Sequence, residues 1–142
     1  MRVMGLDLGS RTCGVAVSDA LCMVARPLET IRFPDEKNDI ALERIVELIK
    51  EHEVHLLVLG LPKHMNGDIG IRAEISIKFK EKLESRTGLR VVLIDERMTT
   101  MQASRILISA DVSRSKRKKV IDQMAAVTIL QGFLDSSMSK AA

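Results

Sequence analysis

Residues 3–18 read Val3-Met-Gly-Leu-Asp-Leu-Gly-Ser-Arg-Thr-Cys-Gly-Val-Ala-Val-Ser18, and this stretch decides the fold class. An apolar run up to Leu8, a short Gly-Ser-Arg turn and a second run of β-branched and small residues are typical of two antiparallel strands. Residues 23–33 predict a third strand. The chain is therefore expected to begin with an antiparallel meander of three strands.

The remaining sequence predicts strands that alternate with helices. Strands are predicted over residues 55–60 and 90–95. Helices are predicted over residues 37–52, from about 71 to 88, from about 99 to 110 and over 120–134. The apolar positions that share a face in the first two helices are Ile40, Ala41, Ile45, Leu48 and Ile49, and then Ile71, Ile75, Phe79 and Leu83.

Strand-helix-strand units imply parallel pairing through right-handed crossovers. We therefore expect an α/β fold, a mixed five-stranded sheet of three antiparallel strands followed by two parallel ones, flanked by helices. The length of 142 residues fits a single domain over residues 1–142.

Composition narrows the class of protein. Hydrophobic residues make up 46% and charged residues 29% of the chain, which is typical of a globular protein. The longest apolar run, residues 54–61, is too short to cross a bilayer, and the N-terminal sequence lacks the apolar core of a signal peptide. We expect a cytoplasmic protein with no membrane partner.

The net charge of +3 is unevenly distributed. Five of the 22 basic side chains lie in residues 114–119, which contain no acid. The rest of the chain has 17 basic and 19 acidic side chains and is therefore slightly acidic. Such a run can bind phosphates in a salt-dependent, sequence-independent way, or it can be a solvated loop between helices. The basic residues concerned are Arg114, Lys116, Arg117, Lys118 and Lys119.

Asp7 is a carboxylate inside a strand-like apolar run. Burying an unpaired carboxylate is costly, so the residue needs a partner. Gly5, Asp7 and Gly9 face the same way, which leaves space for a ligand. The alternative is that Asp7 caps the following turn through backbone amides.

Two further acids occupy unusual positions. Glu96 shares the strand face of Val92 and Ile94 by alternation; alternatively it pairs with Arg97 at the end of the strand. Asp122 aligns with the inward face of the last predicted helix; alternatively it only complements the helix dipole. The residues on that inward face are Ala125, Ala126, Ile129 and Phe133.

The three acids are explained best together. Converging carboxylates without His or Cys partners are typical ligands of hard cations, Mg²⁺ or Mn²⁺, that also bind substrate phosphates. We therefore expect Asp7, Glu96 and Asp122 to be metal ligands. A fourth acid could come from Asp95 or Asp19, although alternation turns Asp95 away.

Four motifs in order resemble the YqgF/RuvX family, which is similar to RNase H and to the RuvC resolvase. They are Asp7-Leu-Gly-Ser-Arg-Thr-Cys-Gly-Val-Ala-Val-Ser-Asp19, Gly60-Leu-Pro-Lys-His-Met-Asn-Gly67, Asp95-Glu-Arg-Met-Thr-Thr100 and Ile121-Asp-Gln-Met-Ala-Ala126. Members are described as candidate Holliday-junction resolvases and as nucleases that process the 5′ end of precursor 16S rRNA. The resemblance implies an RNase H-like, Mg²⁺-dependent nuclease that acts in ribosome biogenesis or in DNA recombination and repair.

The resemblance also implies roles for individual residues. The acidic catalytic site of the family corresponds to Asp7, Glu96 and Asp122. Asp7 would bridge two metal ions, and Glu96 and Asp122 would hold one ion each. Nucleic acid, either precursor rRNA or branched DNA, would be the partner, together with ribosomal-subunit precursors, and the protein would be a monomer or a weak homodimer. The residues expected to contact substrate are Ser10, Arg11, Lys63, Asn66, Arg97 and Thr99.

Two other functions remain open at this point. The fold could serve a non-catalytic RNA-binding factor in ribosome assembly. The Asp-x-Gly-Ser turn also resembles the phosphate loop of actin and sugar-kinase ATPases, although those proteins hold ATP between two such domains. Aromatic residues make up only 2% of the chain, with no Trp or Tyr, so nucleic acid would be recognised through its backbone and shape.

Overall fold

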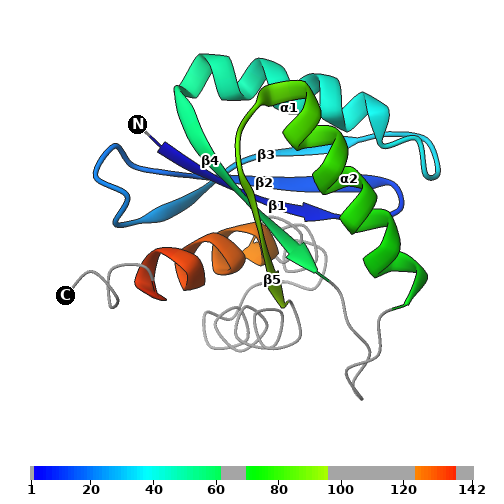
Figure 1. Ribbon diagram of the computed structural model, residues 1–142. Coiled ribbons are helices and arrows are strands. Elements are labelled where there is room, and N and C mark those ends of the chain that lie inside the picture. The colour runs from blue at the N-terminus through cyan, green and yellow to red at the C-terminus, as the bar shows by residue number, and fades with distance from the viewer. Residues whose placement is uncertain (1, 62–69, 96–123, 137–142) are drawn as a thin grey trace, which may run out of the picture.

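The computed structural model describes residues 2–61, 70–95 and 124–136. Five strands form one sheet in the order β3-β2-β1-β4-β5 (Figure 1). Their bounds are β1 (Arg2–Leu8), β2 (Thr12–Ser18), β3 (Ala25–Arg32), β4 (Val54–Leu61) and β5 (Val91–Asp95). β2 pairs antiparallel with both β1 and β3, whereas β4 pairs parallel with β1 and β5. The predicted mixed sheet is confirmed.

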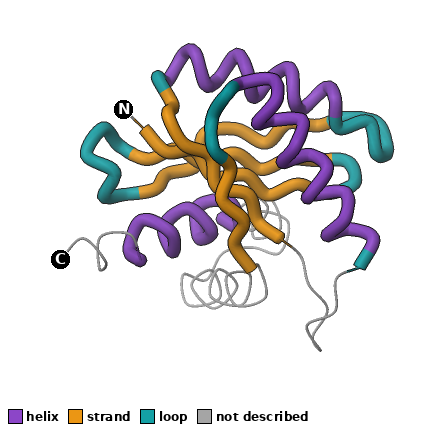
Figure 2. The backbone as a smooth tube through the Cα atoms, in the orientation of Figure 1, coloured by secondary structure: helices purple, strands orange, loops and turns teal. Residues whose placement is uncertain are grey.

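Helices lie on both faces of the sheet (Figures 1 and 2). α1 (Asp39–His52) and α2 (Ile71–Thr87) cover one face, and a helix over residues 124–136 covers the other. Alternation along β1 separates the two sides: Met4 and Leu6 are buried in the larger core, whereas Val3 packs with the last helix. Among the helices of the described residues, none is both long and apolar enough to cross a membrane.

The structure corrects two predicted core positions. Ile40 is 48% exposed and Ile71 is 76% exposed, because both lie in the first turn of their helices, before the apolar face reaches the sheet. Leu42 takes an inward position on α1, as Ala73 and Ser76 do on α2. The helix predicted after Thr99 lies outside the described residues.

The last helix approaches β1 closely at Gly5. A Cβ atom on Gly5 would lie 2.7 Å from Leu130 Cβ and 3.0 Å from the carbonyl oxygen of Ala126. Farther along the helix, the Gln131 side chain accepts a hydrogen bond from the backbone N–H of Ala25 (2.8 Å), at the start of β3. The helix therefore runs antiparallel to β1, and its residue 124 end is directed toward the C-terminal end of that strand.

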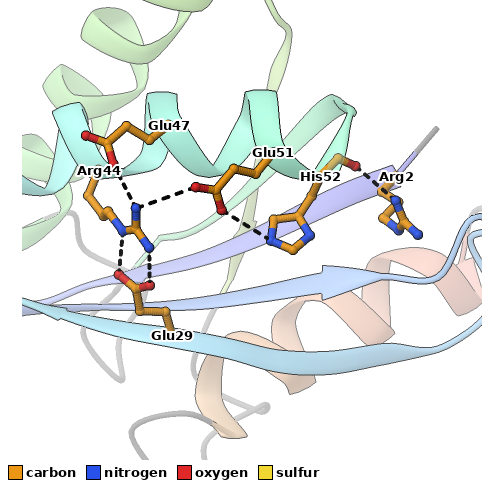
Figure 3. A network of polar contacts seen from close by, with 6 residues as sticks. All are labelled: Arg2, Glu29, Arg44, Glu47, Glu51 and His52. Carbon is orange, nitrogen blue, oxygen red and sulfur yellow. Dashed lines mark hydrogen bonds and ion pairs between the residues drawn. The ribbon is translucent and has the colours of Figure 1, made fainter.

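An ionic network joins α1 to the edge strand β3 (Figure 3). Arg44 donates two hydrogen bonds of 2.9 Å to the carboxylate of Glu29 and one of 2.7 Å to Glu47. These hydrogen bonds from Arg44 lower the pKa of the Glu29 carboxyl below its ordinary value of 4.5. Near the other end of α1, Arg2 donates to the carbonyl of His52 (3.2 Å). The network fixes which face of β3 is directed toward α1.

Substitution of Gly5 tests the helix contact. Gly5→Ala is expected to lower the free energy of unfolding by about 1–3 kcal/mol, because the new methyl group would lie only 2.7 Å from Leu130 Cβ and 3.0 Å from the Ala126 carbonyl oxygen. Gly132→Ala is the matched control, since nothing lies within 4 Å of its added Cβ. That substitution should stabilise the helix by about 0.5–1 kcal/mol. Urea denaturation measures both values, and a Gly5→Ala protein as stable as the wild type would contradict the close approach.

The stability contributed by Glu29 should depend on pH. Because its pKa is lowered on folding, the contribution is complete above pH 4.5 and is lost as the pH falls through the folded-state pKa. Both partners are about one-third exposed, so Glu29→Gln should cost at most about 1 kcal/mol at pH 7. Denaturation at several pH values should show the difference from wild type narrowing below pH 4.5. Glu51→Gln, at a more exposed partner of Arg44, is the control; an equal loss there would refute the special role of Glu29.

Candidate active site

Asp7 lies near the C-terminal end of β1, half-buried, on the face that also carries Gly5 and the last helix. Its neighbour in β2 is Gly14. On the other side, β1 and β4 are paired up to Leu6 and Leu59, and the next residue of β4 is Gly60. Neither adjacent strand therefore places a side chain beside the Asp7 carboxylate.

The Asp7 carboxylate forms no hydrogen bond or ion pair with any residue that the structure describes. The turn that follows β1 is closed by the backbone instead, since the N–H of Gly9 donates to the carbonyl of Thr12 (2.7 Å). The alternative that Asp7 caps this turn is therefore not supported. A half-buried carboxylate without a protein partner is suited to a cation.

The parallel strands β1, β4 and β5 end at one edge of the sheet, where ligands meet open α/β sheets. Ile94 of β5 pairs with Gly60 and packs in the cluster of the last helix, so Ile94 faces the same side as Asp7. Two residues farther along the chain is Glu96, which lies outside the described residues.

The last helix carries the inward face that the sequence predicted. Ala125, Ala126 and Ile129 are buried, and Phe133 packs against the same cluster. Asp122 is one turn before this face in sequence and lies outside the described residues. Of the three predicted metal ligands the structure thus describes only Asp7, and its described residues contain no group of three His, Cys, Asp or Glu able to hold a metal.

Ser10 and Arg11 form the exposed turn after β1, at the same end of the sheet as Asp7. Their carbonyls accept hydrogen bonds from the N–H groups of Glu36 (2.8 Å) and Phe33 (2.9 Å). The Arg11 guanidinium lies 3.8 Å from the Asp35 carboxylate, and both side chains are largely exposed. The loop between β3 and α1 therefore holds this turn.

Glu36 extends the same connection to α2. It adopts a left-handed backbone conformation (φ 61°), and its carboxylate pairs with Arg72 in the first turn of α2. Glu36 and Arg72 thus link the turn after Asp7 to the start of α2. Neither residue is predictable from the sequence, because an exposed Glu and an Arg 36 positions apart give no local signal.

The suggestion that Asp19 supplies a fourth acid to the Asp7 site is wrong. Its carboxylate accepts hydrogen bonds from the N–H groups of Met23 (2.8 Å) and Val24 (3.2 Å), which lower its pKa. Asp19 follows the last residue of β2, beside the beginning of β1, and so lies at the opposite end of the sheet from Asp7.

The other predicted substrate contacts fall in segments 62–69 and 96–123, outside the described residues. They are Lys63, Asn66, Arg97, Thr99, Arg114, Lys116, Arg117, Lys118 and Lys119.

Comparisons with known proteins show which family the chain resembles. Residues 1–136 match the model of a family described as RuvX, Holliday junction resolvase. A candidate pre-16S rRNA nuclease of a Geobacillus species is 57% identical over 136 residues, covering 96% of this chain and 99% of the relative. The corresponding protein of Staphylococcus epidermidis is 53% identical, covering 95% of this chain and 96% of the relative.

A solved structure has the same fold at much lower identity. RuvC of Thermus thermophilus in complex with a Holliday junction substrate has a TM-score of 0.60 at 14% identity. The alignment covers 98% of this chain and 96% of that one. The predicted RNase H-like fold is confirmed.

Proposed function

The chain belongs to the RuvX family of Holliday junction resolvases, and on that premise we propose that it is a metal-dependent endonuclease that processes the 5′ end of precursor 16S rRNA. The single observation that carries the proposal is Asp7, a half-buried strand carboxylate between two glycine positions and without a described protein partner. The names of the relatives favour RNA as the substrate. The description of the family favours a four-way DNA junction as the second candidate.

Asp7, Glu96 and Asp122 would hold Mg²⁺ or Mn²⁺. When bound, the metal would supply an activated water and stabilise the leaving oxygen of the cleaved phosphodiester. Two described features support the proposal that the three carboxylates meet. Ile94 of β5 faces the same side of the sheet as Asp7, and the residue 124 end of the last helix is directed toward the C-terminal end of β1. Three carboxylates at one place repel each other, and a divalent cation offsets that repulsion.

The chain's other residues would bind and orient the nucleic acid. Ser10 and Arg11 lie in the turn after Asp7, and the hydrogen bonds to the loop before α1 hold that turn in place. Arg97 and Thr99 would contact the cleaved phosphate, and Lys63 and Asn66 would contact the strand around it.

The proposed substrates indicate where the protein would act and how many copies of it cleavage would require. The relatives named above are bacterial, and bacterial rRNA precursors and chromosomal DNA are both in the cytoplasm. For a precursor rRNA a monomer suffices, whereas symmetric cleavage of a junction would require two copies.

Asp7→Asn provides the test. It is expected to lower Mg²⁺-dependent cleavage of a precursor 16S rRNA fragment on the order of 10³-fold, because a metal ligand is lost. RNA binding should stay the same or tighten, since one negative charge near the phosphates is removed. Cleavage of the same molar amount of a four-way DNA junction, measured in parallel, distinguishes the two substrates.

Asp39→Asn is the control for this substitution, because Asp39 is an exposed acid on α1 that pairs with Lys82 (3.1 Å). It should cleave like the wild type. Unchanged cleavage by Asp7→Asn would refute the site. A wild-type protein that binds the RNA without cleaving it would instead favour a non-catalytic assembly factor.

The basic run is tested by salt dependence. Alanine at Lys116, Arg117, Lys118 and Lys119 should reduce the slope of log K against log salt by about 3, because each lost phosphate contact lowers it by about 0.7–0.9. Alanine at Lys78 and Lys82, on α2 beyond the opposite face of the sheet, should leave the slope nearly unchanged. An unaltered slope in the fourfold variant would show that the run is a solvated loop.

A further inference from the structure

Arg32, the last residue of β3, lies on the same face of the sheet as Asp7. We propose that the Arg32 guanidinium binds a backbone phosphate of the RNA substrate on the flank of the active site, an inference that rests on the proposed function. Arg32 pairs with Thr12 in β2, and Thr30 pairs with Gly14, the neighbour of Asp7. Residues directly opposite each other in paired strands share a face, so one row joins Asp7, Gly14 and Thr30.

The contacts of Glu29 and Ile31, which alternate with Thr30 and Arg32 along β3, confirm that Arg32 is on the side of the sheet away from α1. Glu29 is bound by Arg44 of α1, and Ile31 is buried in the core beneath α1. Side chains alternate along a strand, so Thr30 and Arg32 are directed to the other side, away from α1.

A β-bulge produces this arrangement. Between Val15 and Ala16 the register with β3 shifts, since Val15 pairs with Glu29 but Ala16 pairs with Pro27. In an uninterrupted strand Arg26 and Arg32, six residues apart, would share a face. The extra residue reverses the alternation, so Arg26 faces the α1 side and Arg32 the Asp7 side. Bulges commonly re-aim side chains beside active sites.

The strands place only small side chains between Asp7 and Arg32. Gly14, Thr12 and Thr30 are the positions that β2 and β3 contribute there. Two strand spacings of about 4.8 Å and one step of about 7 Å along the strand give about 12 Å between the two Cα atoms. The described part of the last helix packs on Gly5 and Ala25, on the other half of this face.

Arg32 is also available for a ligand. It is exposed and forms no ion pair or hydrogen bond with the described residues. By contrast, Arg44, Arg72 and Arg86 are held by glutamates on the α1 and α2 side. A guanidinium without a carboxylate partner can bind a phosphate through two parallel hydrogen bonds.

Arg26 provides a matched control. It lies on the same edge strand, is exposed and has no ion pair in the described structure. It pairs with Val17, whose side chain is buried in the core on the α1 side. If charged side chains on β3 serve only to prevent edge-to-edge aggregation, the two arginines are equivalent.

The experiment measures binding of a labelled RNA duplex that carries the 5′ precursor end of 16S rRNA. The full chain is used, at several salt concentrations. Arg32→Gln should weaken binding about three- to tenfold and lower the salt slope by about 1. Arg26→Gln should change the dissociation constant less than twofold, and Arg32→Lys should keep the slope. Thermal unfolding of each variant verifies that it is folded.

The outcomes separate this inference from the proposed function. Equal effects of Arg32→Gln and Arg26→Gln, no effect of Arg32→Gln, or no salt-dependent binding by the wild type would each overturn the role of Arg32. If the wild type cleaves the RNA and Arg32→Gln leaves the salt slope of binding unaltered, the role of Arg32 is refuted and the proposed function is retained. A reduced slope in a protein that does not cleave would support Arg32 and refute the nuclease activity.

Discussion

The rest of the structure depends on the close contact between Gly5 and the last helix. With no side chain at Gly5, the helix backbone approaches β1 and covers the half of the sheet that contains Val3, Ala16 and Ala25. Asp7 is two residues farther along the same face. The contact therefore determines both where the second apolar core is and where the sheet face carries a carboxylate instead.

The two faces of the sheet differ in how their charges are satisfied. On the α1 and α2 side, Arg44 is paired with Glu29 and Arg86 with Glu43, whereas Arg26 on the edge strand has no ion pair among the described residues. On the other face Asp7 and Arg32 have no partner among the described residues. Asp7 and Arg32, whose Cα atoms are about 12 Å apart, offer a carboxylate and a guanidinium that fit a polyanion arriving with a divalent cation.

Much of the fold was predictable because strong local patterns agree with the tertiary structure. The turn after Leu8, the alternation in β1 and the inward face at Ala126 and Ile129 all fold as the sequence indicates. The prediction that Ile40 and Ile71 are core positions was wrong, because periodicity alone does not show where a helix first meets the sheet. For the site, Asp7 was predictable from its apolar surroundings, but Arg32 was not, because its face depends on a bulge, and Pro27 indicates an edge strand or a bulge without locating the extra residue.

The proposed nuclease activity requires that Asp7, Glu96 and Asp122 share a divalent metal. A crystal structure of the full chain soaked in Mn²⁺, with anomalous diffraction to locate the ion, tests it most directly. We expect an anomalous peak within bonding distance of carboxylate oxygens from all three residues. A Mn²⁺ ion bound elsewhere, or three carboxylates too far apart to share one, would contradict it.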